Sequence, residues 1–317
     1  MKPIVVSVIG PTAVGKSKLG IEISKRFGGE VINGDSMQFY QGFNIGTAKV
    51  TETEADGVPH HLIDFLREDD HYSAASFQAD LYDRVQHITN RQRIPVVVGG
   101  TGFYIQSALF NFNFADVNRD DAYVEAAIAD IYANGVAPYY EKLQHVDPIQ
   151  ATKIHPHNIR RVVRALEIYE RTGQTMSELE EQQTNDSPYT PYIIGLNMSR
   201  EVLYERINRR VDQMIDDGLY DEVTYLYEQF GGEIQAMQGI GYKEWIPYLR
   251  GEISFDSVVA SIKQHTRRFA KRQLTYYRNK MSDVHWYTID PERYEETFET
   301  IFSDLAGFLR DKTNSNN

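Results

Sequence analysis

Eight residues near the start of the chain have the types and the spacing of a phosphate-binding loop. Gly10-Pro11-Thr12-Ala13-Val14-Gly15-Lys16-Ser17 fits the P-loop pattern G-x-x-x-x-G-K-[ST]. In such a loop the backbone N–H groups and a helix N-terminus surround an anion, and the lysine adds a positive charge on the outer phosphates. The alternative is a glycine turn that contains lysine by chance, but this does not account for all four fixed residues. We therefore predict a site for a diphosphate or triphosphate, with the Ser17 hydroxyl as a ligand for Mg²⁺.

The flanking residues have the patterns of the strand and the helix that a P-loop joins. Residues 4–9 are an apolar run rich in β-branched side chains, which predicts a buried strand. Residues 16–27 are predicted to be helical because Leu19, Ile23 and Phe27 recur at helical spacing. A P-loop binds phosphates whatever is attached to them, so the reaction has to be identified from the rest of the chain.

Asp35 is the first candidate for acid–base chemistry. It ends a second predicted strand, residues 30–35, and a third, residues 95–98, runs into Gly99-Gly100-Thr101-Gly102. The carboxyl ends of parallel strands share one edge of the sheet, so Asp35 and Thr101 are expected beside the P-loop. Asp35 could instead cap a helix or act as a Walker B acid near magnesium. A Walker B acid normally ends an apolar strand, and the third strand ends in glycine, so we favour a catalytic role.

Composition restricts the class of protein. The chain has 317 residues, 41% of them hydrophobic, and no cysteine, which excludes disulfides, a cysteine nucleophile and thiolate zinc sites. No apolar run is long enough to span a membrane, and the N-terminus leaves no room for a signal peptide, so we expect a cytoplasmic protein without membrane contact. His60 and His61 are adjacent and have no third ligand at suitable spacing, so no zinc site is predicted.

Basic residues are concentrated in two segments although the formal net charge is −12. Residues 257–282 contain no acid but seven lysines and arginines, of which Lys263, Arg267, Lys271 and Arg278 share one helical stripe. Residues 160–164 form a second basic segment. A basic helix face is usually only solvated, but two such segments in an acidic chain favour a defined track for a polyanion. The residues expected to contact it are Arg160, Arg161, Arg164, Arg267 and Lys271.

Strands and helices alternate along the first part of the chain, which predicts an α/β fold: a P-loop NTPase-like parallel sheet covered by helices. From about residue 113 the pattern changes to helices with polar connections, and it returns to a strand at residues 192–196. We therefore predict three segments. They are a first part of the core (1–112), an inserted helical subdomain that binds the polyanion (113–191), and the completion of the core with basic helices (192–317).

Together these residues resemble the tRNA dimethylallyltransferase (tRNA isopentenyltransferase) family, in its shorter bacterial form without a zinc finger. The resemblance extends from the P-loop nearly to residue 280 and depends on several motifs in a fixed order. After the P-loop these are Asp35-Ser36-Met37-Gln38, residues 45–49, residues 60–64, residues 99–102, residues 160–167, Gly239-Ile240-Gly241-Tyr242-Lys243-Glu244, and residues 266–273. The departures from the family pattern, Phe39, Asn44 and Val50, are confined to one region.

The resemblance implies transfer of a dimethylallyl group from dimethylallyl diphosphate to N6 of the adenosine 3′-adjacent to the anticodon in tRNA, with release of diphosphate. Magnesium is the implied cofactor, the anticodon stem-loop is the implied partner, and we expect a monomer. Asp35 is implied as the base, and Thr12, Thr101 and Arg210 as contacts of the diphosphate. The neighbours Arg206 and Arg209 leave the choice of arginine open. The implied tRNA contacts are Asp35, Ser36, Met37, Gln38, Thr101, Gln238, Gly239, Ile240, Gly241, Tyr242 and Lys243, with the basic residues above.

Three alternatives remain. A P-loop small-molecule kinase would bind ATP and release ADP. An adenylate isopentenyltransferase would do the same chemistry on a free nucleotide but would not need basic tracks or a helical insertion. A non-catalytic RNA-binding module would leave the P-loop and Asp35 without a role.

Overall fold

The computed structural model describes residues 2–114, 120–183 and 186–314. The chain forms two compact units, a larger one of residues 1–109 and 187–317 and a smaller one of residues 110–186. No helix in the described ranges combines the length and the apolar character needed to cross a membrane.

The larger unit is built on one sheet of six parallel strands in the order β3-β2-β4-β1-β5-β6. The strands are β1 (Ile4–Ile9), β2 (Gly29–Asn33), β3 (His60–His61), β4 (Ile94–Val98), β5 (Thr190–Asn197) and β6 (Val284–Thr288). In the centre, Val6 of β1 lies between Val96 of β4 and Tyr192 of β5. The predicted α/β fold with a parallel sheet is confirmed. The central strands are continuously apolar because helices cover both faces.

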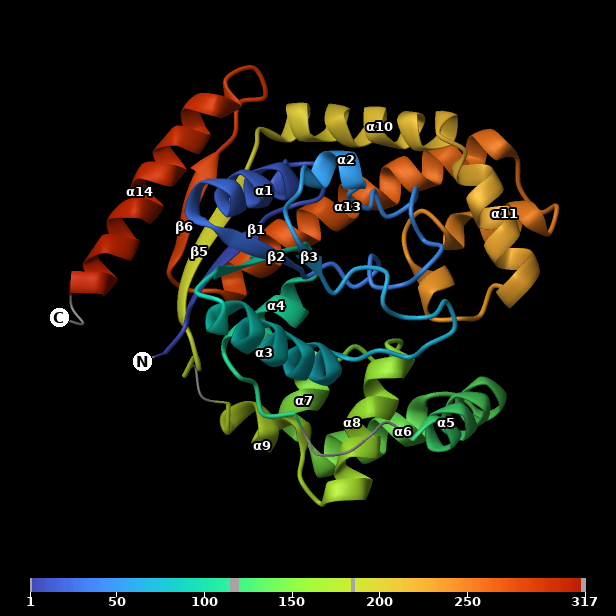
Figure 1. The fold of residues 1–317 in the computed structure, drawn as a ribbon. Helices are drawn as coiled ribbons and strands as arrows, with labels where there is room; N and C mark the ends of the chain where they lie inside the picture. Colours follow the sequence, from blue (N-terminus) through green and yellow to red (C-terminus); the bar gives the residue numbers. More distant parts are fainter. Residues whose placement is uncertain (1, 115–119, 184–185, 315–317) are drawn as a thin grey trace. The chain divides into compact units, whose positions relative to one another are not determined.

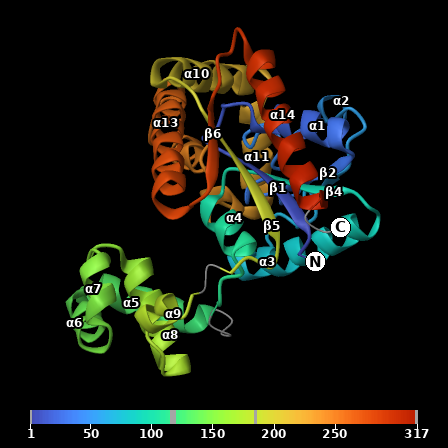
Figure 2. The ribbon, with the colours of Figure 1, turned by 90° about the vertical axis from the view of Figure 1, so that its left-hand side faces the viewer.

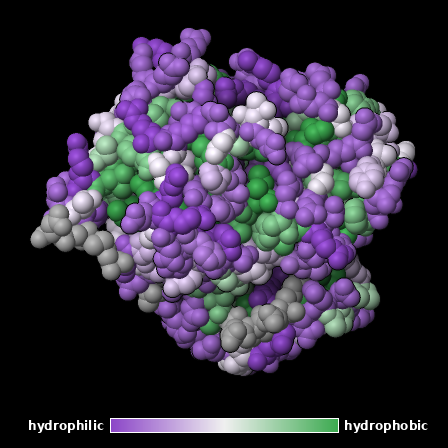
Figure 3. Space-filling model, viewed as in Figure 1, coloured by the Kyte–Doolittle hydropathy of each residue, from purple (hydrophilic) through white to green (hydrophobic). Residues whose placement is uncertain are grey.

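Helices lie on both sides of this sheet (Figures 1 and 2). On one side, α1 (Lys16–Phe27) and α14 (Tyr294–Asn314) pack with alternate residues of the central strands, including Val6, Val8, Ile194 and Leu196. On the other side lie α3 (Ala74–Asn90) and α4 (Gly102–Leu109). Hydrophilic residues predominate on the face shown in Figure 3, where hydrophobic residues gather in separate areas.

Two long helices complete the larger unit beside the carboxyl ends of the strands. These are α10 (Arg200–Asp216) and α13 (Phe255–Lys280), which lie side by side. Residues 200–230 form an almost entirely helical stretch. The structure divides it at Gly218, whose φ of 98° is unfavourable for other residues, and α11 (Leu219–Phe230) follows. The short helices are α2 (Glu52–Ala55), η1 (Ala236–Gln238), η2 (Lys243–Trp245) and α12 (Ile246–Leu249).

The smaller unit is helical. It contains α5 (Asp121–Asn134), α6 (Ala137–Val146), α7 (Pro148–Lys153), α8 (Ile159–Thr172) and α9 (Met176–Glu181). Its apolar side chains form two clusters of its own, one around Leu143 and Leu166 and one around Ile131 and Val163. The expected insertion, 113–191, ends inside β5, because residues 190 and 191 pair with β1 as part of the sheet.

Candidate active site

A cavity of about 460 Å³ opens where the central strands end, and every residue lining it belongs to the larger unit. Seven segments contribute to its wall. They are the P-loop, the turn at residues 35–37, the loop at 46–48, the turn at 100–103, the turn at 238–241, and the facing sides of α10 and α13. The fold thus brings together residues that are more than 200 positions apart in the sequence.

The P-loop connects β1 to α1, as predicted. Ala13 and Gly15 have φ angles of 65° and 105°, which turn successive backbone N–H groups toward the start of the helix. Lys16 folds back over the loop and its Nζ donates to the carbonyl of Pro11 at 2.8 Å. Burial lowers the pKa of Lys16 to about 8, against the opposing effect of Asp35, and Arg210 lowers it further. The loop therefore has the backbone geometry that suits an anion, and its lysine has a lowered pKa.

Asp35 lies in the turn that follows β2 rather than in the strand, which ends at Asn33. The Asn33 side chain fixes this turn: its Oδ1 accepts the Asp35 N–H at 3.0 Å, and its Nδ2 donates to the carbonyl of Leu62 at 2.9 Å. Oδ1 of Asp35 accepts the Met37 N–H at 3.2 Å. Burial raises the pKa of the Asp35 carboxyl, and the nearby Lys16 ammonium partly opposes this. Such a carboxylate has a stronger tendency to take up a proton than an exposed one.

Thr101 stands beside Asp35, as the sequence predicted. Its hydroxyl oxygen accepts the Ser36 N–H at 3.0 Å and lies 3.2 Å from the Ser36 hydroxyl, to which it donates. The Thr101 N–H donates to the carbonyl of Gly34 at 3.3 Å. Gly99 allows this close approach, because a Cβ there would lie 2.2 Å from the carbonyl carbon of Gly34. The turns after β2 and β4 therefore form one hydrogen-bonded unit.

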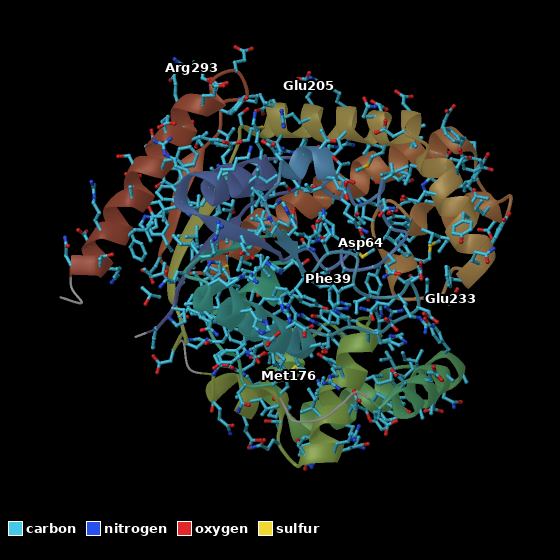
Figure 4. The ribbon with its side chains drawn as sticks, viewed as in Figure 1. Phe39, Asp64, Met176, Glu205, Glu233 and Arg293 are labelled. Atoms are coloured by element: carbon cyan, nitrogen blue, oxygen red, sulfur yellow. The ribbon has the colours of Figure 1, made fainter. Side chains whose placement is uncertain are left out.

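The three neighbouring arginines of α10 have different environments. Arg209 pairs with Glu205 at 2.6 Å on the outer side of the helix, where Figure 4 labels Glu205. Arg206 points inward, and its Nε donates to the carbonyl of Ala13 in the P-loop at 3.0 Å. Arg210 lines the cavity, where partial removal from water and then the charge of Arg206 lower its pKa. Arg210 is thus the arginine whose side chain faces the cavity, and Arg206 is a P-loop contact that the sequence did not reveal.

The turn at 36–38 is fixed to the loop at 46–48. Nε2 of Gln38 donates to the carbonyls of Thr47 and Ala48, at 3.1 and 3.3 Å. Met37 lines the cavity against Gly239, where a Cβ would lie 2.4 Å from the Met37 methyl group. Phe39, labelled in Figure 4, is fully buried among aromatic rings.

Glu222 of α11 holds residues 44–46, which lead into the loop at 46–48. Its carboxylate accepts the backbone N–H groups of Asn44, Ile45 and Gly46 at 3.0, 2.8 and 3.1 Å, and the Tyr242 hydroxyl at 2.7 Å. The Tyr242 ring fills the space beside Gly46, because a Cβ there would lie 2.6 Å from it. No sequence pattern pointed to Glu222, whose partners in this loop are almost 180 positions away.

Only part of the predicted segment 238–243 lines the cavity. Gln238, Gly239, Ile240 and Gly241 line the cavity. Tyr242 is buried beneath the loop at 46–48, and Lys243 is exposed.

The basic residues of α13 fall into two groups, one bonded to α10 and one lining a groove. Lys263 and Arg267 are bonded to α10, to Asp212 at 2.5 Å and to Asn208 at 2.6 Å. Lys271 instead lines an open groove along α13 with Arg268, Arg272 and Lys280. Arg272 and Tyr276 line both the groove and the cavity, so the groove adjoins the cavity. On α13 the positive charge of the groove thus comes from Arg268, Lys271, Arg272 and Lys280, whereas Arg267 faces α10.

In the smaller unit, Arg160 and Arg161 are exposed at the start of α8. Arg164 is paired at 2.8 Å with Glu167, a fully buried carboxylate that also accepts the Asp120 N–H at 2.6 Å. The positive charge of Arg164 is therefore partly neutralised by Glu167 within the smaller unit.

The described residues contain no cluster of three or more histidine or carboxylate side chains suited to hold a metal ion. His60 bonds to the carbonyl of Val58 and His61 to Glu30. Ser17 is exposed at the first turn of α1, and its hydroxyl has no hydrogen-bond partner in the described ranges. One free hydroxyl fits Mg²⁺, which commonly takes one or two protein ligands and completes its shell with phosphate oxygens and water.

The comparisons with known proteins agree with one another. The family model described as IPP transferase matches residues 38–280. The chain is 49% identical to the tRNA dimethylallyltransferase of Oceanobacillus iheyensis, over 99% of this chain and 100% of the relative, and 47% identical to that of Bacillus pumilus, over 97% and 96%.

Solved structures give the same result. The tRNA isopentenylpyrophosphate transferase of Bacillus halodurans matches with a TM-score of 0.75 and 42% identity, covering 100% of this chain and 99% of that one. A eukaryotic dimethylallyltransferase acting on tRNA matches with a TM-score of 0.83 and 30% identity, covering 99% and 80%.

Proposed function

This chain belongs to the tRNA dimethylallyltransferase family, and on that premise we propose that it transfers a dimethylallyl group from dimethylallyl diphosphate to N6 of the adenosine 3′-adjacent to the anticodon in tRNA. The observation that carries the proposal is the single cavity that joins the P-loop to Asp35 and Thr101. A group-transfer enzyme needs its leaving-group site and its base at a fixed separation, because orientation supplies much of the rate acceleration.

The diphosphate of the donor occupies the P-loop in this proposal. The backbone N–H groups, Lys16 and Arg210 stabilise the negative charge that develops on the leaving oxygen. Thr12 and Thr101 contact the diphosphate from either side. The hydrocarbon part lies against the apolar wall that α10 and α13 provide, which includes Ile207, Val211, Met214, Ile262 and Phe269. This arrangement excludes water from the allylic carbon.

Asp35 is the base. The N6 lone pair attacks the allylic carbon, the carbon–oxygen bond breaks, and the diphosphate leaves with the bonding electron pair. N6 becomes acidic only as its new bond forms, so a carboxylate is a sufficient base, and such help is worth roughly 10²–10⁴-fold. Oδ1 of Asp35 is held by the Met37 N–H, and Oδ2 makes no hydrogen bond within the described residues. Oδ2 is the oxygen that takes the proton.

Ser17 is the residue that would hold Mg²⁺, together with oxygens of the diphosphate. When bound, the ion supplies positive charge at the leaving group.

The adenosine leaves its stack to reach N6. Ser36, Met37 and Gln38 on one side and Gln238, Gly239, Ile240 and Gly241 on the other form the pocket for the base, with Tyr242 and Lys243 beside it. The anticodon stem-loop lies along Lys271, with Arg268 and Arg272 adding to that surface, and it contacts Arg160, Arg161 and Arg164. Arg267, which is bonded to Asn208 of α10, supports this surface rather than contacting the RNA. The cavity is complete within one chain, which supports a monomer, and a tRNA substrate supports action in the cytoplasm.

The test is incubation of the protein with unmodified tRNA and either dimethylallyl diphosphate or ATP, followed by analysis of the nucleosides. N6-dimethylallyladenosine should form only with dimethylallyl diphosphate. Prenylation of AMP at a comparable rate would favour an adenylate isopentenyltransferase, and ATP-dependent release of ADP would favour a kinase.

A further inference from the structure

Gln273 of α13 joins the two halves of the cavity through a single side chain. It is 5% exposed, and it is the last residue of the motif 266–273. The sequence assigned roles to Arg267 and Lys271 of that motif but none to Gln273. Its Oε1 accepts the N–H of Thr12 in the P-loop at 2.8 Å. Its Nε2 donates to the carbonyl of Gly100 at 2.9 Å, one residue before Thr101. One amide therefore connects the P-loop to the turn that carries Thr101.

The two bonds require both ends of an amide. Thr12 presents a donor and Gly100 an acceptor, so the bridging group must accept at one end and donate at the other. A glutamate would face the Gly100 carbonyl with a second acceptor and bring a negative charge to the P-loop. An apolar side chain would leave both backbone groups without partners.

The surroundings fix the position of this amide. A Cβ on Gly100 would lie 2.5 Å from Nε2 of Gln273, so glycine at that position makes room for the side chain. One turn later on the same helix, the fully buried Tyr277 places its hydroxyl 3.5 Å from the carbonyl of Gly99. The same face of α13 thus holds both glycines of the turn.

From this geometry we infer that Gln273 is a positioning residue that sets the separation between the diphosphate site and the Asp35–Thr101 pair, and that its neutral amide keeps the P-loop receptive to a diphosphate. The inference rests on the proposed function, because it assumes that the P-loop binds the donor diphosphate. Gln273 acts through Thr12 and Gly100 and not on the reacting atoms.

The test is Gln273→Glu, measured as binding of inorganic diphosphate by calorimetry at pH 8 and at pH 5.5. At pH 8 the carboxylate should weaken binding relative to wild type by about 100-fold, because like charges placed together without water are strongly unfavourable. A protonated glutamate has a carbonyl and an O–H and so reproduces the acceptor and donor of glutamine. The deficit relative to wild type should therefore shrink to about tenfold or less at pH 5.5.

Two controls accompany this measurement. Gln264→Glu adds the same charge at an exposed position of α13 and should change diphosphate affinity by less than about threefold. Gln273→Met removes both hydrogen bonds at similar size. It should raise the KM for dimethylallyl diphosphate about tenfold at both pH values and leave the KM for tRNA unchanged, since each buried backbone group left unpaired carries a cost.

The outcomes separate the two proposals. Wild-type affinity in Gln273→Glu at pH 8, or a deficit that is equal at both pH values, overturns the inference. If Gln273→Glu does not fold, a folded Gln273→Met with normal donor KM overturns it instead. Failure of the wild-type protein to bind inorganic diphosphate contradicts the proposed role of the P-loop and hence the proposed function itself.

Discussion

At the residue scale, the Asp35 carboxyl group lines the cavity and the Lys16 ammonium group lies in the adjoining P-loop, and burial disfavours the charged form of each. The pKa of Asp35 is raised and the pKa of Lys16 is lowered, and each charge partly offsets the burial of the other. Neighbouring ionisable groups with perturbed pKa values are typical of sites that handle protons and charge. Both shifts lead to measurable pH dependence.

For Asp35→Asn we expect kcat to fall by about 10²-fold or more, because the amide keeps the size of the side chain but cannot accept a proton at neutral pH. Affinities for tRNA and diphosphate should change far less. In the wild type, kcat should decline as pH falls through the raised pKa of Asp35, and this acidic limb should be absent in the variant. The measurement is steady-state kinetics from pH 5 to about pH 8.

Asp35→Asn should also change the thermal stability of the protein. The folded-state pKa of Asp35 lies above its unfolded value, so its contribution to stability is lost as pH rises through the folded pKa. Asp35→Asn should therefore raise the Tm at neutral pH.

One kinetic outcome would contradict the role of Asp35 as base. If Asp35→Asn had a near-normal kcat and a KM that depends on magnesium, Asp35 would be assigned to the metal ion.

For Lys16 we expect the affinity of the wild type for inorganic diphosphate to fall as pH rises through about 8, where the ammonium group loses its proton. The total loss should be about tenfold or more, because a charged hydrogen bond contributes roughly 1.5–3 kcal/mol. In Lys16→Arg the guanidinium stays protonated, so its affinity, whatever its absolute value, should be flat from about pH 7 to pH 9. A parallel decline in both proteins would locate the titration elsewhere.

At the scale of elements, α13 has three separate functions on its different sides. One side presents Gln273 and Tyr277 to the glycine turn, another ties Lys263 and Arg267 to α10, and the third forms the open groove. Because α13 is one continuous helix of 26 residues, its three sides keep fixed positions relative to one another. The charge on the helix therefore cannot be treated as a single stripe.

This division leads to a prediction for tRNA binding. Arg268→Ala with Lys271→Ala removes two charges of the groove and should lower the slope of log K against log salt by about 0.7 for each phosphate that is no longer neutralised. The matched control is Lys263→Ala with Arg267→Ala, which removes the same charge from side chains bonded to α10 and should change the slope less. Diphosphate binding should stay the same in both. Equal slopes in the two pairs would show that the groove is only solvated.

At the scale of the whole molecule, the larger unit closes without the smaller one. The hydroxyl of Ser187 donates to the carbonyl of Leu109 at 2.5 Å, so the two ends of the larger unit meet where the insertion leaves and returns. Within the smaller unit, Gln183 is bonded through both ends of its amide to the backbone of Asn113, at 2.7 and 2.6 Å. In each unit, hydrogen bonds thus connect the two chain segments at which the insertion begins and ends.

Replacement of residues 110–186 by a short glycine–serine linker should therefore leave a folded protein, because a short loop adds little closure entropy. Diphosphate affinity should remain within about threefold of wild type, since every residue of the cavity is retained. Affinity for tRNA should fall by at least about tenfold through the loss of Arg160 and Arg161. Unchanged tRNA affinity would exclude a role of the smaller unit in tRNA binding.

The sequence by itself determined those features that depend on neighbours along the chain. The P-loop, the parallel sheet and the helical character of the basic segment in α13 follow from local spacing and periodicity, because backbone hydrogen bonds and apolar faces repeat at fixed intervals. Phe298, Ile301, Phe302 and Leu305 of α14 show the same periodicity, so that helix, which we did not predict, was also present in the pattern. The place of Asp35 and Thr101 followed from the shared edge of a parallel sheet.

Only the tertiary structure decided the features that depend on partners distant in sequence. Gln273 meets Thr12 across 261 positions, Glu222 holds a loop almost 180 positions away, and Arg206 reaches Ala13. Helical periodicity places Arg267 and Lys271 on one stripe, but the packing of α10 sets which of them remains open. Local patterns fix which side of a helix is polar. The partner of each polar group depends on how the helix is rotated and docked, and that is a property of the packed core as a whole.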